Sequence, residues 1–94
     1  MSGEIKFDEN KMRQAIDHMR RGAKELRQTI QQTQNLAGLI EKGALVGDAG
    51  TQFQTSIKST LNSKIEEIAQ KLEEQARFTE VELAQLLKAA SQLR

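Results

Sequence analysis

The glycine-rich stretch in the middle of this 94-residue chain constrains its fold more than any other feature. Residues 43–50 read Gly-Ala-Leu-Val-Gly-Asp-Ala-Gly and hold three of the six glycines. Long segments of helical period lie on both sides. Glycine can adopt the positive φ angles that end one helix, and it can cap the next. The stretch therefore predicts the bend of a hairpin, with helices over about 9–42 and 49–92 and the bend over 43–48.

The first segment carries an apolar or small residue at every third or fourth position. Asp8 is a good N-cap for it, and Phe7 can pack on Met12 as a hydrophobic staple. A helix from about residue 9 to 42 is too long to be stable on propensity alone, so it must pack along its length. The predicted seam consists of Met12, Ile16, Met19, Ala23, Leu26, Ile30, Thr33, Ala37, Ile40 and Ala44.

The second segment carries a similar seam that is less regular. Asp48 is the better cap at its start, with Gly47 as the alternative. Runs of four-residue steps near the bend are expected to unwind the supercoil locally and straighten the helix there. Ile5, Val81 and Leu87 lie off the seam and are candidates for other contacts. The predicted seam consists of Phe53, Ile57, Leu61, Ile65, Ile68, Leu72, Ala76, Thr79, Leu83, Leu86, Ala90 and Leu93.

Charge adds an argument about orientation. Residues 11–27 hold six basic and two acidic side chains, whereas residues 66–82 hold six acidic and two basic ones. An antiparallel hairpin brings the two blocks face to face, which favours one register. The stretches 28–35 and 52–63 are rich in amides and hydroxyls and can accept a partner helix with little charge desolvation. The sequence thus predicts a single all-α domain over 1–94, an antiparallel two-helix hairpin that completes a four-helix assembly with itself or with a partner.

Several functional classes are poorly supported by the composition. The chain has no cysteine and a single histidine, His18, without a carboxylate cluster around it, so we expect no catalytic, cofactor or metal site. A net charge of +1 and a basic block without aromatic residues argue against nucleic acid. The apolar runs are too short for membrane insertion, and the first residues contain no apolar core of a Sec-type signal peptide.

Two short motifs resemble those of a known family. The bend around Leu45, Gly47 and Phe53 is similar to the Trp-x-Gly bend of the WXG family of small type VII secretion proteins, with Leu45 at the position of the tryptophan. Phe78 and Glu82 resemble the Tyr-x-x-x-Asp/Glu export signal of that family, with phenylalanine in place of tyrosine. Length and hairpin layout extend the likeness over nearly the whole chain. The missing tryptophan points to the divergent small helical proteins that accompany LXG toxins in Gram-positive bacteria.

The resemblance implies a non-enzymatic type VII secretion protein. Its partner would be the helical N-terminal domain of an LXG-type toxin, a paralogous hairpin or a second copy of itself, and it would also meet the type VII export machinery. Such a protein is made in the cytoplasm and secreted without a cleaved signal peptide. The resemblance also implies that Phe78 and Glu82 act as a targeting signal.

Two other functional classes stay open from the residues. A helical-hairpin subunit of a secretion filament would polymerise rather than stop at a dimer. A coiled-coil adaptor would remain in the cytoplasm.

Overall fold

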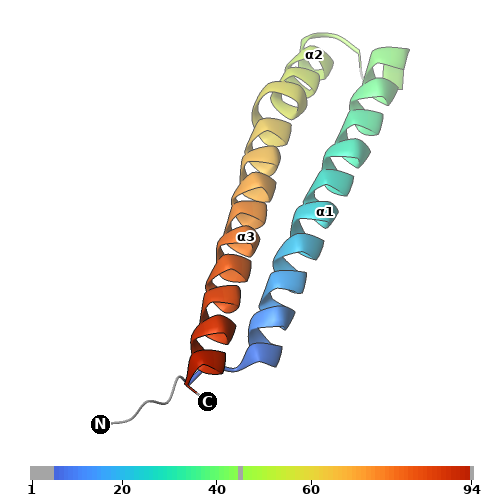
Figure 1. Cartoon of the computed structure of the whole chain (residues 1–94). Coiled ribbons are helices and arrows are strands. Elements are labelled where there is room, and N and C mark those ends of the chain that lie inside the picture. Colours follow the sequence, from blue (N-terminus) through green and yellow to red (C-terminus); the bar gives the residue numbers. More distant parts are fainter. Residues whose placement is uncertain (1–5, 45, 94) are drawn as a thin grey trace.

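The computed structural model describes residues 6–44 and 46–93 and confirms the all-α antiparallel hairpin (Figure 1). Helix α1 spans Glu9–Leu39 and ends in a wide π-helical turn, η1, at Ile40–Ala44. After the bend, helix α2 (Asp48–Thr55), the π-helical segment η2 (Ser56–Leu61) and helix α3 (Asn62–Gln92) form one continuous rod beside it. The molecule measures 71 × 16 × 14 Å. Two long, thin helical rods therefore make up the whole described fold.

The start of α1 is fixed by its own first residues. The Asp8 carboxylate accepts a hydrogen bond from the Lys11 backbone N–H at 2.9 Å, which confirms the expected N-cap. Phe7 and Met12 both pack against the buried cluster that contains Ile16. The cap satisfies one of the free N–H groups of the first turn, and the apolar contact sets the angle at which the chain enters the helix.

Two glycines with positive φ shape the bend. Gly43 (φ 102°) interrupts the helical conformation within η1, and Gly47 (φ 90°, ψ −166°) is the N-cap of α2. The expectation that Asp48 caps this helix was wrong, because Asp48 is its first residue and no side chain caps the helix. At that position its carboxylate still interacts favourably with the positive end of the helix dipole. Leu45 lies outside the described residues.

We predict that Gly47→Val destabilises the protein by about 1 to 3 kcal/mol. A Cβ at Gly47 would meet no atom within 4 Å, so the cost comes from the backbone conformation, which β-branched residues rarely adopt. The melting temperature of the variant, compared with that of the parent, measures this loss of stability. Gly38→Ala is the matched control, because Gly38 is also free of neighbours within 4 Å but lies inside α1. It should stabilise by about 0.5 to 1 kcal/mol. Equal melting temperatures for both variants would contradict this account of the bend.

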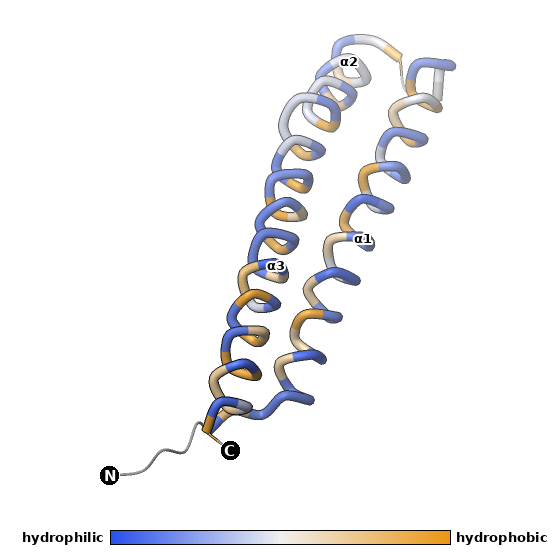
Figure 2. Tube along the Cα trace, in the orientation of Figure 1, coloured by the Kyte–Doolittle hydropathy of each residue, from blue (hydrophilic) through white to orange (hydrophobic). Residues whose placement is uncertain are grey.

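The core between the rods is thin and rich in small side chains. Figure 2 shows that hydrophobic positions recur between hydrophilic ones along both rods. Among the described residues no large side chain is fully buried, and the alanines at positions 23, 37, 69 and 76 are at most 1% exposed. Alanine lets the two helix axes approach closely but contributes little apolar area. The buried residues in the described part of the chain are Ile16, Ala23, Ala37, Ile40, Gly50, Ile57, Asn62, Ala69, Ala76 and Leu83.

The predicted seam of α1 agrees with this pattern, but that of the second rod needs correction. Phe53, Leu61, Ile68 and Leu93 are all at least 45% exposed. The buried positions of α3 recur at intervals of seven through 62, 69, 76 and 83, so Asn62 and Ala69 face α1 in place of the residues preceding them. When small side chains occupy the centre of the contact between two helices, the larger side chains next to them lie at the edge of that contact.

The π-helical segment η2 explains part of this one-residue shift between the predicted and the observed buried positions. Seam positions that follow one another by four residues move gradually around an α-helix, because the helix has 3.6 residues per turn. A π-helical turn contains more residues, and it absorbs such a drift. Ile57 lies within η2 and is 4% exposed, whereas Leu61 at its end has turned to the edge. The run of four-residue steps near the bend was thus the signal of a π-helical segment rather than of a straighter α-helix.

One polar pair interrupts the apolar seam. Asn62 is 8% exposed, and its Oδ1 accepts a hydrogen bond from the Thr33 hydroxyl on the facing helix. The Thr33 hydroxyl also lies 2.8 Å from the Ile30 carbonyl oxygen of its own helix. A buried amide of this kind requires a polar partner at one place on the opposite helix. Asn62 belongs to the amide-rich stretch 52–63 that the sequence predicted as a surface for a partner helix, but its side chain contacts the other helix of the hairpin.

Candidate functional site

The seam divides the surface of the hairpin into two flanks that differ in chemistry. In two antiparallel helices, residues that follow the buried positions by four lie on one side, and residues that precede the buried positions by one lie on the other. We call the first side the arginine flank; it contains Arg20, Arg27, Glu66, Glu73 and Glu80. The second side carries no charge at Ala15, Gly22, Thr29, Leu36, Leu61, Ile68 and Gln75, and we call these seven positions the uncharged flank. The next position of the series on α3 is Glu82, which lies at the end of this flank.

The arginine flank is a ladder of ion pairs between α1 and α3. Arg27 donates to Glu73 at 2.7 Å and to Glu66 at 3.0 Å, and it bridges two turns of the facing helix. Arg20 donates through both terminal nitrogens to the carboxylate of Glu80, with the Nη1–Oε2 pair at 3.0 Å. The predicted meeting of the basic and acidic blocks is therefore confirmed. The ion pairs are partly solvated, so they contribute more to the choice of register between α1 and α3 than to the stability of the hairpin.

The ladder shifts the titration of its members. Hydrogen bonds from the Arg27 guanidinium lower the pKa of Glu66 and of Glu73, and a hydrogen bond from Arg20 lowers the pKa of Glu80. Near the bend, the hydrogen bond from Lys58 at 2.9 Å lowers the pKa of Glu41 in the same direction. In each case the cation stabilises the charged form of the carboxylate.

We predict that acid destabilises the hairpin through this ladder and that Arg27→Gln weakens the effect. A carboxylate whose folded pKa is depressed contributes stability above its usual pKa of 4.5, and this contribution is lost as the pH falls through the lowered value. Melting temperatures at pH 7 and below pH 4.5 should differ less for Arg27→Gln than for the parent. Arg21→Gln is the control, because Arg21 pairs with Asp17 on its own helix. A parallel pH dependence in all three proteins would contradict the prediction.

The uncharged flank presents apolar groups to solvent. Leu36, Leu61 and Ile68 are 43%, 45% and 51% exposed, and the other members are small or carry an amide or a hydroxyl. At Gly22, an added Cβ would lie only 3.3 Å from Leu72 Cδ1, so the surface is low there because glycine occupies the position. A low, uncharged strip bordered by leucine and isoleucine is suited to a partner helix.

The accessible surface of the chain is larger than a compact monomer would have. It amounts to 7267 Å², whereas a compact protein of 10.6 kDa exposes roughly 5,500 Å². The difference is larger than the area of about 800 Å² that each partner buries in a standard protein interface. A long, thin hairpin exposes more surface than a compact fold of the same mass.

The two residues of the predicted export signal, Phe78 and Glu82, are both exposed on α3. Phe78 is 65% exposed, so it is no part of the core. Glu82 follows one turn later and is also exposed, and among the described residues no hydrogen bond or ion pair involves its carboxylate. The spacing of four places the ring and the carboxylate on the same side of the helix. Val81, which lies between them in sequence, is 52% exposed.

The remaining candidates from the sequence are distributed as follows. Phe53, the third residue of the bend motif, lies in α2 and is 45% exposed, and His18 is exposed on α1. Within 6–44 and 46–93 no group of three or more histidine, cysteine and acidic side chains is arranged to hold a metal ion. No helix in the same ranges is both long and apolar enough to cross a bilayer.

Comparison with known proteins gives one match. The family model WXG100, described as proteins of 100 residues with WXG, matches residues 4–93. No curated protein and no solved structure matches the chain significantly.

Proposed function

Since the chain belongs to the WXG100 family, whose members are small helical proteins associated with type VII secretion, we propose that it is an export factor that pairs with a helical partner. The uncharged flank is the pairing surface, and the assembly is a four-helix bundle. The partner is the helical N-terminal domain of an LXG-type toxin, a paralogous hairpin or a second copy of the chain. Phe78 and Glu82 supply the export signal, and the protein leaves the cell without a cleaved leader.

The exposure of the uncharged flank carries this proposal. Three large aliphatic side chains, Leu36, Leu61 and Ile68, border a strip without any charge, beside a core that contains no fully buried large side chain. Covering these side chains removes apolar area from water at about 25 cal/mol per Å² and requires no desolvation of an ion pair. The arginine flank offers no such advantage, because its charges already pair across the hairpin.

Export from the producing cell tests the function. A tagged chain, produced in its host with and without the type VII membrane ATPase, should enter the culture medium only when the ATPase is present. A cytoplasmic marker protein measures lysis. Equal release from both strains would contradict the type VII assignment, and polymerisation of the pure protein into filaments would support the rival structural role.

A further inference from the structure

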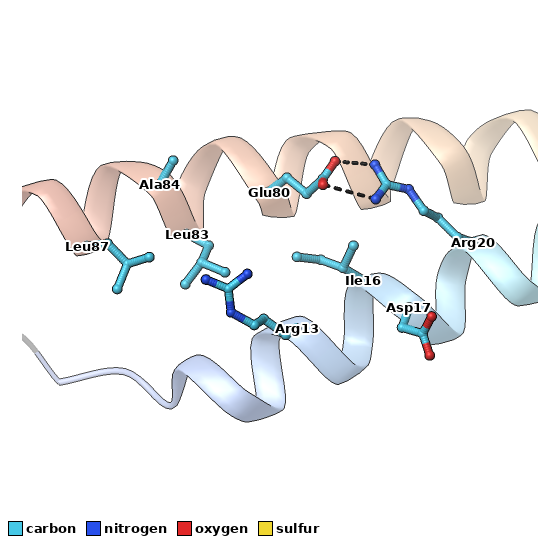
Figure 3. A pocket seen from close by; sticks show the side chains of 8 residues that line it. All are labelled: Arg13, Ile16, Asp17, Arg20, Glu80, Leu83, Ala84 and Leu87. Atoms are coloured by element: carbon cyan, nitrogen blue, oxygen red, sulfur yellow. Dashed lines mark hydrogen bonds and ion pairs between the residues drawn. The ribbon is translucent and has the colours of Figure 1, made fainter.

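A groove lies on the arginine side of the hairpin, near the end where α1 begins (Figure 3). It is open to solvent and has a volume of about 350 Å³. Its apolar side chains come from both helices, and the Arg20–Glu80 ion pair crosses between the helices at one end of it. The lining residues are Arg13, Ile16, Asp17, Arg20, Glu80, Leu83, Ala84 and Leu87.

The ladder of ion pairs lacks one rung at this groove. Glu66, Glu73 and Glu80 follow one another at intervals of seven on α3, and the next position in the series is Leu87. Arg13 occupies the corresponding next position on α1, seven residues before Arg20. Arg13 therefore meets no carboxylate of α3, and Leu87 packs against the apolar cluster instead.

Arg13 is only partly engaged by its own helix. Its Nε and Nη2 each lie 2.8 Å from Glu9 Oε2, and the two side chains are 58% and 43% exposed. A solvated pair of this kind is weak. Nη1 has no acceptor among the described residues, so the guanidinium keeps a donor for a second carboxylate. The other charges of the groove are already matched, Arg20 by Glu80 and Asp17 by Arg21.

We propose that this groove docks a helix of another protein that carries a large apolar side chain and a carboxylate one turn later. The apolar side chain packs on Ile16, Leu83 and Leu87, and the carboxylate pairs with Arg13 as the missing rung. A helix suits the site because the groove runs between two helices, and positions four apart lie on one side of a helix. This surface is separate from the uncharged flank, so one hairpin can hold a pairing partner and this second helix at once.

Charge complementarity determines which charge the docked helix must carry. A basic helix would place a second cation beside Arg13 and Arg20, whereas a helix without charge would leave the Arg13 donor without an acceptor. The carboxylate gains a charge-assisted hydrogen bond, which is stronger than a neutral one. The apolar side chains of the groove contribute buried surface, but they do not discriminate between apolar partners. The specificity of the site therefore depends on Arg13.

Fluorescence anisotropy with a labelled, hydrocarbon-stapled helical peptide tests the proposal on the full chain. The peptide is built from alanine and glutamine and carries one leucine and, four residues later, one glutamate. We expect saturable binding that weakens about tenfold in Arg13→Gln, the loss of one charge-assisted contact of about 1.4 kcal/mol. The same peptide with glutamine in place of its glutamate should bind the parent as weakly as the glutamate peptide binds Arg13→Gln.

Two further variants separate docking from general charge attraction. Leu87→Glu supplies the missing rung from within the chain, so it should abolish binding while thermal melting shows a folded protein. Lys71→Gln removes an equal charge away from the groove, because Lys71 pairs with Glu67 on its own helix and neither residue lines the groove. It should bind the peptide as the parent does. Absence of binding to the parent at millimolar peptide, or equal loss of binding in Arg13→Gln and Lys71→Gln, would overturn the proposal.

Discussion

Leu61→Glu combined with Ile68→Glu is expected to convert the assembled protein into monomers. Both side chains border the uncharged flank, and both are about half exposed in the single hairpin. In a four-helix assembly they would be covered, and a buried carboxylate without a partner costs about 3 to 5 kcal/mol. The dissociation constant should therefore rise at least about 100-fold. Sedimentation velocity over a concentration series measures the change.

Val81→Glu is the control for this experiment. Val81 is 52% exposed on α3, so the substitution adds one negative charge, half that of the double variant, to the same rod without entering the flank. It should leave the association constant within about twofold of the parent value, because an exposed charge pair contributes little. A parent protein that sediments as a monomer with a concentration-independent melt would show that the uncharged flank does not pair two copies of this chain.

Phe78→Ala and Glu82→Ala should each abolish export while the protein stays folded. Phe78 is 65% exposed, so its truncation leaves no cavity in the core and the melting temperature should stay near that of the parent. In the proposed signal, the ring is desolvated in a pocket of the export machinery and the carboxylate pairs with a basic group there. Both contacts are needed, because the two groups form one small docking site. The secreted fraction of each variant, measured by immunoblot, gives the result.

Pairing must be measured beside export, because Glu82 precedes the buried Leu83 and so lies at the end of the uncharged flank. Val81→Ala and Glu74→Ala serve as matched controls on the same helix. Both should be exported normally. Normal export of Phe78→Ala and Glu82→Ala would remove the signal from consideration, and a loss of pairing in the same variants would assign the residues to the interface instead.

The parts of the fold that could be predicted are those that repeat along the chain. The seam of α1 keeps a regular spacing from Met12 to Ile40, so its buried face can be identified from the sequence alone. The opposed charge blocks likewise gave the antiparallel arrangement that Arg20 and Arg27 now show. Each signal depends on many residues, and the substitution of one residue does not remove it.

The parts that could not be predicted depend on single residues and on the facing helix. Ala69 lies deeper than Ile68 because the α1 surface opposite it is close, and hydrophobicity by itself favours isoleucine for the buried position. The groove at Arg13 can be recognised only when the arginines of α1 are aligned in space with the glutamates of α3. Only that alignment shows that Leu87 stands opposite Arg13, where a glutamate would continue the ladder. The uncharged flank could have been found earlier by examining the residues that precede each buried position.

The hydrogen bond between Thr33 and Asn62 fixes the alignment of the two helices independently of the length of the bend. If α3 slid along α1 by seven residues, Asn62 would face Leu26 or Ile40, whose side chains cannot accept or donate a hydrogen bond. An unsatisfied buried amide costs about 1 to 3 kcal/mol. A bend with one residue more or fewer between Gly43 and Gly47 should therefore leave Thr33 opposite Asn62.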